Sequence, residues 1–238
     1  MLLAVIRFLV LAAIKVAGIL FYSWDARWIG ERPLLGIKAW RSVRLVVILN
    51  HTSLFEPIMS RLLPFAFLWR LARHATFPVA DKTMARPVVG FILRLLAPKV
   101  ISITRARDAS WSQFLEKIDQ DAIILIAPEG RMKRPNGLDK DGNPMTVRGG
   151  IAEILHLIES GTMLIAYSGG LHHVQAPGQG LPHLFRRIAV VMEAIDIVGY
   201  KNSLKGVDED SHPMASFKLR VIRDLETRRD AVLEQMSR

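Results

Sequence analysis

Residues 43–57 read V-R-L-V-V-I-L-N-H-T-S-L-F-E-P, and this stretch decides the fold. Residues 45–49 form an unbroken run of β-forming apolar side chains, which predicts a buried strand. The run ends two residues before His51, and Glu56 lies where a following helix would begin. Functional side chains in α/β proteins gather where a strand ends and a helix starts, so we expect His51 and Glu56 to form the functional centre.

The rest of the chain continues this alternation of strand and helix. Apolar runs of strand length alternate with segments of helical periodicity, which predicts an α/β fold with a mostly parallel or mixed central sheet flanked by helices. The predicted strands are 77–80, 100–104, 123–127, 163–168 and 188–195, and the predicted helices are 84–96, 109–118, 150–159 and 214–236. The last helix is heavily charged, which predicts a solvated outer layer.

The composition is basic and apolar at the same time. The formal net charge is +10 over 238 residues, of which 50% are hydrophobic, and the mean hydropathy is +0.24. Nucleic-acid-binding proteins are usually basic but polar, whereas proteins on anionic lipid surfaces combine cations with apolar side chains. We therefore expect membrane lipids as partners and no nucleic acid. The absence of cysteine excludes disulfides, a thiolate nucleophile and a cysteine-based zinc site, while the oligomeric state stays open.

The N-terminal region predicts a membrane-associating helix. Residues 2–24 are strongly apolar, and we expect residues 1–28 to form this helix ahead of one main domain, residues 29–238. Arg7 and Lys15 interrupt the apolar run, and a charge at the bilayer centre costs about 2.5–3.5 kcal/mol. This cost favours a helix lying in the membrane interface over a tilted spanning helix, which stays open. The aromatic side chains suited to an interface are Phe21, Tyr22, Trp24 and Trp28.

Two later segments, 62–72 and 88–96, are also apolar and are bordered by arginines. One interpretation makes them core helices with solvated arginines. The other makes them a second apolar surface with a basic rim, facing lipid or an acyl chain. The sequence leaves both interpretations open.

His51 and Glu56 suit general base catalysis if the chain turns between them. A histidine in the loop and a glutamate in the first helical turn can meet, and a carboxylate on one ring nitrogen leaves the other nitrogen free to take a proton. The alternative is structural, because Ser53 and Glu56 match the S-x-x-E capping box. In that interpretation Glu56 caps the backbone and His51 is an ordinary loop histidine.

Two other predicted strand ends carry candidate binding residues. Glu129, Gly130 and Arg131 follow the strand 123–127, and a polar loop with Lys133 comes next. A glycine permits close backbone approach and the cations suit a phosphate, although a basic surface hairpin has the same composition. Arg105 follows the strand 100–104, where a lone arginine is usually solvated. Ends of parallel strands meet at one edge of a sheet, so we expect these residues to converge on His51.

The order of these motifs resembles the glycerophospholipid acyltransferase family, also called PlsC-like, whose type member is lysophosphatidic acid acyltransferase. The motifs are Asn50-His51 with an acid five residues after the histidine, then V-I-S-I-T-R ending at Arg105, then Pro128-Glu129-Gly130. The resemblance spans residues 45–168. It departs from the family pattern at Glu56, where the family usually has Asp, and at Ala-Pro-Glu-Gly-Arg-Met, where the family usually has Phe-Pro-Glu-Gly-Thr-Arg.

The resemblance assigns roles to the candidate residues. It implies that His51 is the general base and that Glu56 orients it. It also implies that five residues bind the polar head of the acceptor: Arg105, Glu129, Gly130, Arg131 and Lys133. Arg131 or Lys133 would stand in for the family's phosphate-binding arginine, which lies between them.

The function implied is O-acyl transfer from acyl-CoA or acyl carrier protein to a lysophospholipid-like hydroxyl. No metal or bound cofactor is implied, because the acyl donor is a substrate. We expect association with the cytoplasmic face of the cell membrane. The alternatives are a lipid hydrolase with the same His51/Glu56 pair, a non-catalytic lipid-binding protein on the same fold, and a nucleic-acid binder, which the apolar N-terminal segment disfavours.

Overall fold

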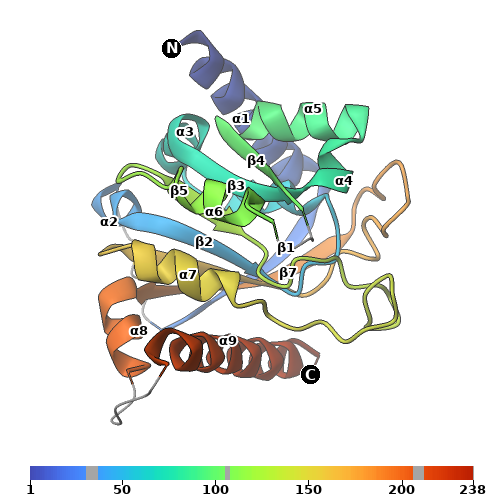
Figure 1. Cartoon of the computed structure of the whole chain (residues 1–238). Helices are drawn as coiled ribbons and strands as arrows, with labels where there is room; N and C mark the ends of the chain where they lie inside the picture. Colours follow the sequence, from blue (N-terminus) through green and yellow to red (C-terminus); the bar gives the residue numbers. More distant parts are fainter. Residues whose placement is uncertain (31–36, 105–107, 206–211, 238) are drawn as a thin grey trace.

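A computed structural model of the chain contains a seven-stranded mixed sheet (Figure 1). The strands are β1 (Ser23–Ile29), β2 (Val43–Leu49), β3 (Ala75–Ala80), β4 (Lys99–Ile103), β5 (Ile123–Ile126), β6 (Thr162–Ser168) and β7 (Arg187–Asp196). Their order is β1-β7-β6-β2-β5-β3-β4. The strands from β6 to β4 in this order are parallel, β7 is antiparallel to β6, and β1 is parallel to β7. The structure describes residues 1–30, 37–104, 108–205 and 212–237.

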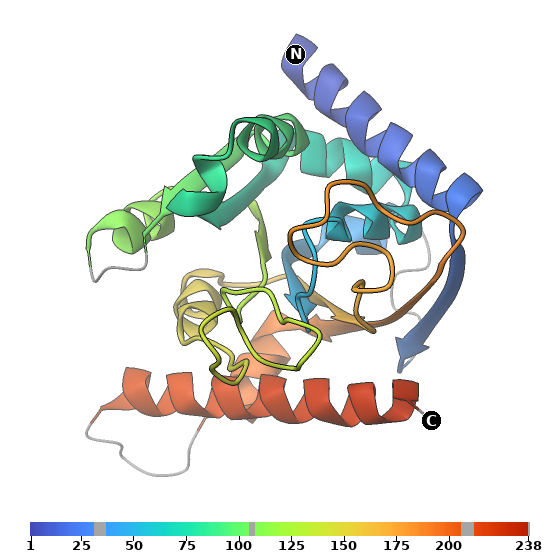
Figure 2. The ribbon, with the colours of Figure 1, turned by 90° about the vertical axis from the view of Figure 1, so that its right-hand side faces the viewer.

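Helices cover both faces of this sheet (Figures 1 and 2). They are α1 (Leu2–Phe21), α2 (Ile37–Arg41), the 3₁₀ helix η1 (Glu56–Leu62), α3 (Phe65–His74), α4 (Asp81–Met84), α5 (Pro87–Leu96), α6 (Ser110–Leu115), α7 (Gly150–Leu157), α8 (Ile197–Ser203) and α9 (Pro213–Ser237). The core on one face includes side chains of α1, η1 and α3, and the core on the other includes side chains of α7, α8 and α9. The predicted α/β class with a mixed sheet and an N-terminal apolar helix is confirmed.

The apolar run of β2 reflects burial on both faces of the sheet. Val46 belongs to the core beneath α1 and α3, whereas Leu45 and Val47 belong to the core beneath α7 and α9. Successive side chains of a strand point to opposite faces, so a central strand of a covered sheet needs apolar residues at every position. This requirement explains why residues 45–49 are uniformly apolar rather than alternating.

The N-terminal helix is shorter than the sequence predicted. It ends at Phe21, and the next residues form β1, which pairs along its length with β7. The predicted extension of the helix through residue 28 is therefore wrong, because main-chain hydrogen bonds to β7 stabilise an extended conformation there. Trp24 and Trp28 pack partly buried against the core.

The predicted helix 84–96 is also interrupted. α4 ends at Met84 and α5 begins at Pro87, a residue that fits the first turn of a helix because it lacks an N–H group. The break folds α4 back onto α5. At Gly90 a Cβ atom would lie 2.5 Å from the Met84 carbonyl oxygen, so this approach requires glycine.

Candidate active site

The strand β2 ends in a tight turn that presents His51. Asn50 has a φ of 61°, in the left-handed region that asparagine tolerates better than most residues. Its Nδ2 donates to the Ser168 carbonyl oxygen at 2.8 Å, which ties the turn to the end of β6. The chain therefore leaves β2 in a fixed direction, and His51 lies at the carboxyl edge of the parallel strands.

The His51 and Glu56 side chains meet, as the sequence predicted for a catalytic pair. His51 Nδ1 and Glu56 Oε2 lie 2.5 Å apart, and the Thr52 N–H donates to Glu56 Oε1 at 2.9 Å. Glu56 is buried, with 4% of its surface exposed, and His51 is partly buried. Because Nδ1 is engaged with a carboxylate, the ring carries its proton there and leaves Nε2 as the basic nitrogen.

The geometry differs from a capping box. In a capping box the glutamate would return to the N–H of Ser53, but Glu56 binds His51 and Thr52 instead. The Ser53 hydroxyl accepts from the Phe55 N–H at 3.1 Å and donates to Gln175 Oε1 at 3.1 Å. The turn is thus closed by Ser53, and the carboxylate of Glu56 is free to hold the imidazole.

The electrostatic surroundings of His51 favour its protonated form. Burial lowers the pKa of His51, but the charge and hydrogen bond of Glu56, together with the charge of Glu129, outweigh burial and leave this pKa above the ordinary histidine value. A raised pKa makes the neutral imidazole a stronger base.

Glu129 holds the main chain of the His51 turn. It is 2% exposed, and its Oε1 accepts from the Asn50 N–H at 2.9 Å while its Oε2 accepts from the His51 N–H at 2.8 Å. Arg229 Nη1 also donates to Oε1, at 3.1 Å. Glu129 therefore converges with His51 as predicted, but its carboxylate contacts protein donors. Direct contact with a substrate stays a prediction.

Gly130 and Lys133 continue along the same edge. Gly130 has a φ of 66°, a conformation that favours glycine. The Lys133 N–H donates to the His51 carbonyl oxygen at 2.8 Å. The side chains of Lys133 and Arg148 make no hydrogen bond or ion pair with any residue that the structure describes, so both cations are available to an anion.

Arg131 points into its own loop. Its Nη1 donates to Asp139 Oδ2 and, at 2.5 Å, to Asp141 Oδ2. The N–H groups of Asn143 and Asp141, with Arg131, overcome the opposing effect of burial and lower the pKa of Asp139 to about 2. Two carboxylates thus compensate the charge of Arg131. The predicted Arg105 lies outside the described residues, and its role stays a prediction.

Comparison with known proteins identifies the family. The sequence model of the family described as Acyltransferase matches residues 36–167, which is more than half of the 238 residues. The chain belongs to the acyltransferase family. This acyltransferase carries His51, Glu56, Glu129 and Gly130 within the matched segment.

A solved structure shares the fold of this acyltransferase. The crystal structure of the 1-acyl-sn-glycerophosphate (LPA) acyltransferase PlsC from Thermotoga maritima superimposes with a TM-score of 0.50 and 18% sequence identity. The alignment covers 92% of this chain and 79% of PlsC. A comparison with curated protein sequences gives no match.

Sequence reasoning missed the residues of the acyltransferase that reach the site from distant segments. Arg229 comes from α9, and Gln175 comes from the segment after β6. Tyr22 packs on Phe55, inside the His51–Glu56 turn, with ring centroids 5.7 Å apart. These pairs join segments far apart in the chain, and no local pattern marks them. The high charge of the last helix was the one available signal for Arg229.

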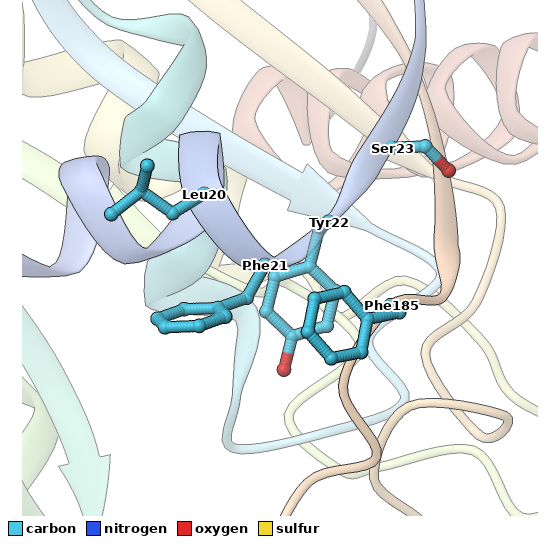
Figure 3. Close-up of a pocket in the computed structure, with 5 residues that line it drawn as sticks. All are labelled: Leu20, Phe21, Tyr22, Ser23 and Phe185. Carbon is cyan, nitrogen blue, oxygen red and sulfur yellow. The ribbon is translucent and has the colours of Figure 1, made fainter.

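A shallow hollow of about 240 Å³ opens beside Tyr22 (Figure 3). It is lined by Leu20, Phe21, Tyr22, Ser23 and Phe185. The rings of Phe21 and Phe185 meet edge to face, with centroids 6.0 Å apart. The end of α1 is therefore apolar and aromatic where the chain passes next to the His51–Glu56 turn.

Proposed function

We propose that this acyltransferase moves a fatty acyl group from a thioester donor to the hydroxyl of a lysophospholipid-like acceptor. The observation that carries the proposal is the 2.5 Å contact between His51 Nδ1 and Glu56 Oε2 at the carboxyl edge of the sheet. The contact leaves Nε2 as the basic nitrogen in a turn whose main chain is fixed. The structurally similar PlsC is named for a 1-acyl-sn-glycerophosphate substrate, which supports a glycerolipid acceptor here.

The proposed reaction is a direct transfer. His51 Nε2 takes the proton of the acceptor hydroxyl while the hydroxyl oxygen attacks the thioester carbonyl carbon. The carbon–sulfur bond then breaks, and the departing thiolate receives the proton from the imidazolium. Such proton transfer contributes typically about 10²–10⁴-fold to the rate. The chain has no cysteine, and the Ser53 hydroxyl is engaged with Gln175, so neither supplies an acyl-enzyme nucleophile.

Lys133 and Arg148 are the proposed binding groups for an acceptor phosphate. The Lys133 N–H donates to the His51 carbonyl oxygen, which places Lys133 next to His51. Arg148 lies beside Gly130, because a Cβ atom added at Gly130 would be 3.9 Å from Arg148 Cγ. Both side chains lack a partner among the described residues, whereas Arg131 is paired with two aspartates. A phosphate held here would orient the acceptor hydroxyl, and orientation supplies several kcal/mol of a barrier.

The proposed position of the acyltransferase is the surface of a membrane. α1 is long and apolar enough to cross a bilayer, and it is the one such helix in the described ranges. Its Lys15, however, donates to the carbonyl oxygens of Arg61 and Leu63 at 2.6 and 2.9 Å, so one side of the helix is fastened to the domain. The other side exposes an apolar stripe of Leu2, Ile6, Leu9, Val16 and Leu20. A fastened helix with one apolar side suits the interface better than a bilayer-spanning position.

The exposed apolar surface continues beyond α1. α5 packs against α1 and exposes Val88, Phe91 and Ile92. Phe185 joins Phe21 at the other end of α1. This arrangement supports the interpretation of residues 88–96 as lipid-facing. The cytoplasmic side of the membrane stays an expectation from the sequence.

Thiol release from acyl-CoA tests the proposed reaction. The protein has no cysteine, so a thiol-reactive dye in a vesicle assay detects only released CoA. Release that requires a lysophospholipid and is lost in His51→Ala is the expected result. Equal release without an acceptor would identify a hydrolase and contradict the proposal. The assay repeated with acyl carrier protein as donor distinguishes the two donor forms, and no release from either would also contradict the proposal.

A further inference from the structure

Arg229 connects the C-terminal helix to the active-site turn. It lies on α9, outside the segment that matches the acyltransferase family, and its side chain is 12% exposed. Its Nη1 donates to Glu129 Oε1 and to the Met145 carbonyl oxygen, each at 3.1 Å. Its Nε donates to Asp230 Oδ1 at 2.9 Å. The guanidinium thus bridges α9, the loop before α7 and the carboxylate behind His51.

Glu129 is the part of this bridge that reaches the catalytic base. Its carboxylate accepts from the main chain on both sides of the bend at Asn50, at 2.9 Å from Asn50 and 2.8 Å from His51. A buried carboxylate that loses one of its partners leaves an uncompensated charge, which is costly. Arg229 supplies the positive charge that balances Glu129 and also directs one of its oxygens.

α9 makes contacts with the rest of the domain besides those of Arg229. The preceding residue, Arg228, pairs with Glu193 at 2.8 Å and with Asp224 at 2.7 Å. Tyr200 donates to the same Asp224 at 2.8 Å. The buried apolar side chains of the helix are Val221, Leu225 and Val232. Adjacent arginines therefore divide two tasks, because Arg228 docks the helix on the sheet while Arg229 points to the active-site turn.

We propose that Arg229 is a positioning residue for acyl transfer, holding Glu129 against the main chain of Asn50 and His51 and balancing its charge beside the imidazole. The inference rests on the proposed role of His51 as general base. It extends the active site to a helix that the family match does not include.

Charge balance gives Arg229 a measurable signature. Among the described residues, the charges of Glu56 and Glu129 raise the pKa of His51. Arg229 and Asp230 lie behind Glu129 on α9. Removal of the guanidinium leaves the charge of Glu129 unbalanced, so the pKa of His51 rises further. A residue that only stabilised the helix would not change this pKa.

The test compares Arg229→Gln with Arg228→Gln, its neighbour on the same helix. In the thiol-release assay we expect Arg229→Gln to lower kcat by about tenfold to a hundredfold with little change in KM, because it misplaces the base rather than the substrate. The acid limb of its pH–rate profile should move upward by on the order of half a pH unit. Arg229→Lys, which keeps the charge, should restore the position of this limb. Arg228→Gln should lower the stability of the protein without moving the acid limb of the pH–rate profile.

A second measurement does not require the substrate. Nuclear magnetic resonance of histidine ¹³Cε1 in detergent micelles follows the titration of His51 directly, with His51→Ala to assign its signal. A rise of the His51 pKa in Arg229→Gln but not in Arg228→Gln supports the inference. Equal loss of kcat in both variants with an unchanged His51 titration would overturn it. An inactive wild type, or an active His51→Ala, would instead overturn the proposed function.

Discussion

His51 is held by two carboxylates that act on different parts of the residue. Glu56 contacts the imidazole, and Glu129 contacts the main-chain N–H. The first sets the tautomer and the second sets the direction in which the ring leaves the backbone. In the proposed mechanism, this preorganisation places the base before substrate arrives.

The raised pKa of His51 predicts the pH dependence of turnover. In the proposed mechanism the neutral imidazole is the active base, so kcat/KM should rise with pH through a midpoint above 6.5, the ordinary histidine value. The stability of the fold should change in the opposite direction, falling as the pH rises. The ion pair with Glu56 stabilises the fold fully below the unfolded pKa, and this contribution disappears as the pH rises through the folded pKa. A midpoint at or below 6.5 in a pH–rate profile would contradict the prediction.

The glutamate at position 56 predicts a cost for the aspartate that the family usually has. Glu56 spans from His51 Nδ1 to the Thr52 N–H with its two oxygens. The shorter Glu56→Asp carboxylate cannot reach both donors from the same backbone, so kcat should fall by about tenfold or more. Steady-state kinetics measure the effect, with the exposed Glu116→Asp as control. Wild-type kcat in Glu56→Asp would show that one contact is sufficient.

At the scale of elements, the loop after β5 contains one cation that is paired within the loop and another that is not. Arg131 is neutralised within the loop by Asp139 and Asp141, whereas Lys133 has no partner in the described part of the chain. The same loop is fastened to α9, because the Val147 N–H donates to Glu226 Oε1 at 2.8 Å. This hydrogen bond holds the main chain of the loop against α9.

This division predicts different effects for two neighbouring substitutions. Lys133→Gln should raise KM for a lysophosphatidic acid acceptor by about tenfold, because it removes a charge-assisted contact of about 1.5–3 kcal/mol. Arg131→Gln should leave KM within about twofold and lower the thermal stability, since its partners are in the loop. Acceptor titrations and thermal unfolding of both variants measure the two effects. A larger KM change in Arg131→Gln would reverse the assignment.

The hydrogen bonds that hold α1 against the domain predict that Lys15 stabilises the fold. Lys15 donates to two carbonyl oxygens at the end of η1, and both hydrogen bonds are partly buried. Lys15→Met should lower the free energy of unfolding by about 1–3 kcal/mol, because it leaves these acceptors unsatisfied. Denaturant unfolding in detergent measures the change, and the exposed Lys117→Met should change it little. Equal free energies of unfolding for the wild type and Lys15→Met would contradict the prediction and indicate that water replaces the lysine.

At the scale of the whole molecule, the exposed apolar surface adjoins the edge of the sheet that carries His51. α1 and α9 lie on opposite sides of the sheet (Figure 2), so the proposed membrane face is on the side of α1. The contact of Tyr22 with Phe55 brings the end of α1 next to the His51–Glu56 turn. An amphiphilic acceptor with its tail in the bilayer would then have its hydroxyl near the catalytic base.

Vesicle binding tests this orientation. Leu9 is 58% exposed on α1, and Leu157 is 47% exposed on α7, which packs on the other face of the sheet. Leu9→Asp should weaken binding to anionic vesicles by about tenfold or more, since burying one leucine contributes about 1.5–3 kcal/mol. Leu157→Asp should leave binding unchanged in the same sedimentation assay. Equal losses in the two variants would exclude α1 as the membrane contact.

Local pattern was sufficient for the central part of the fold and for the core of the site. The run before His51 predicted β2, and the end of that run placed His51 in a loop from which Glu56 could reach the imidazole, although a capping box fitted the same residues. β1 was missed because a strand at the end of a mixed sheet shares its aromatic and polar composition with a membrane interface. The pairing that stabilises β1 comes from β7, more than 150 residues later. The orientation of Glu129 and the contribution of Arg229 likewise depend on three-dimensional packing.

The two amide hydrogens bound to Glu129 have a consequence for local opening. The main-chain N–H groups of Asn50 and His51 donate to the buried carboxylate of Glu129. Glu129 follows β5 and also accepts from Arg229 of α9. Loop amides ordinarily exchange with deuterium by small fluctuations, whereas core amides wait for cooperative unfolding. The amides of Asn50 and His51 belong to the second class, so their deuterium uptake should be as slow as that of β2. Heat should then remove activity and tertiary structure in a single step.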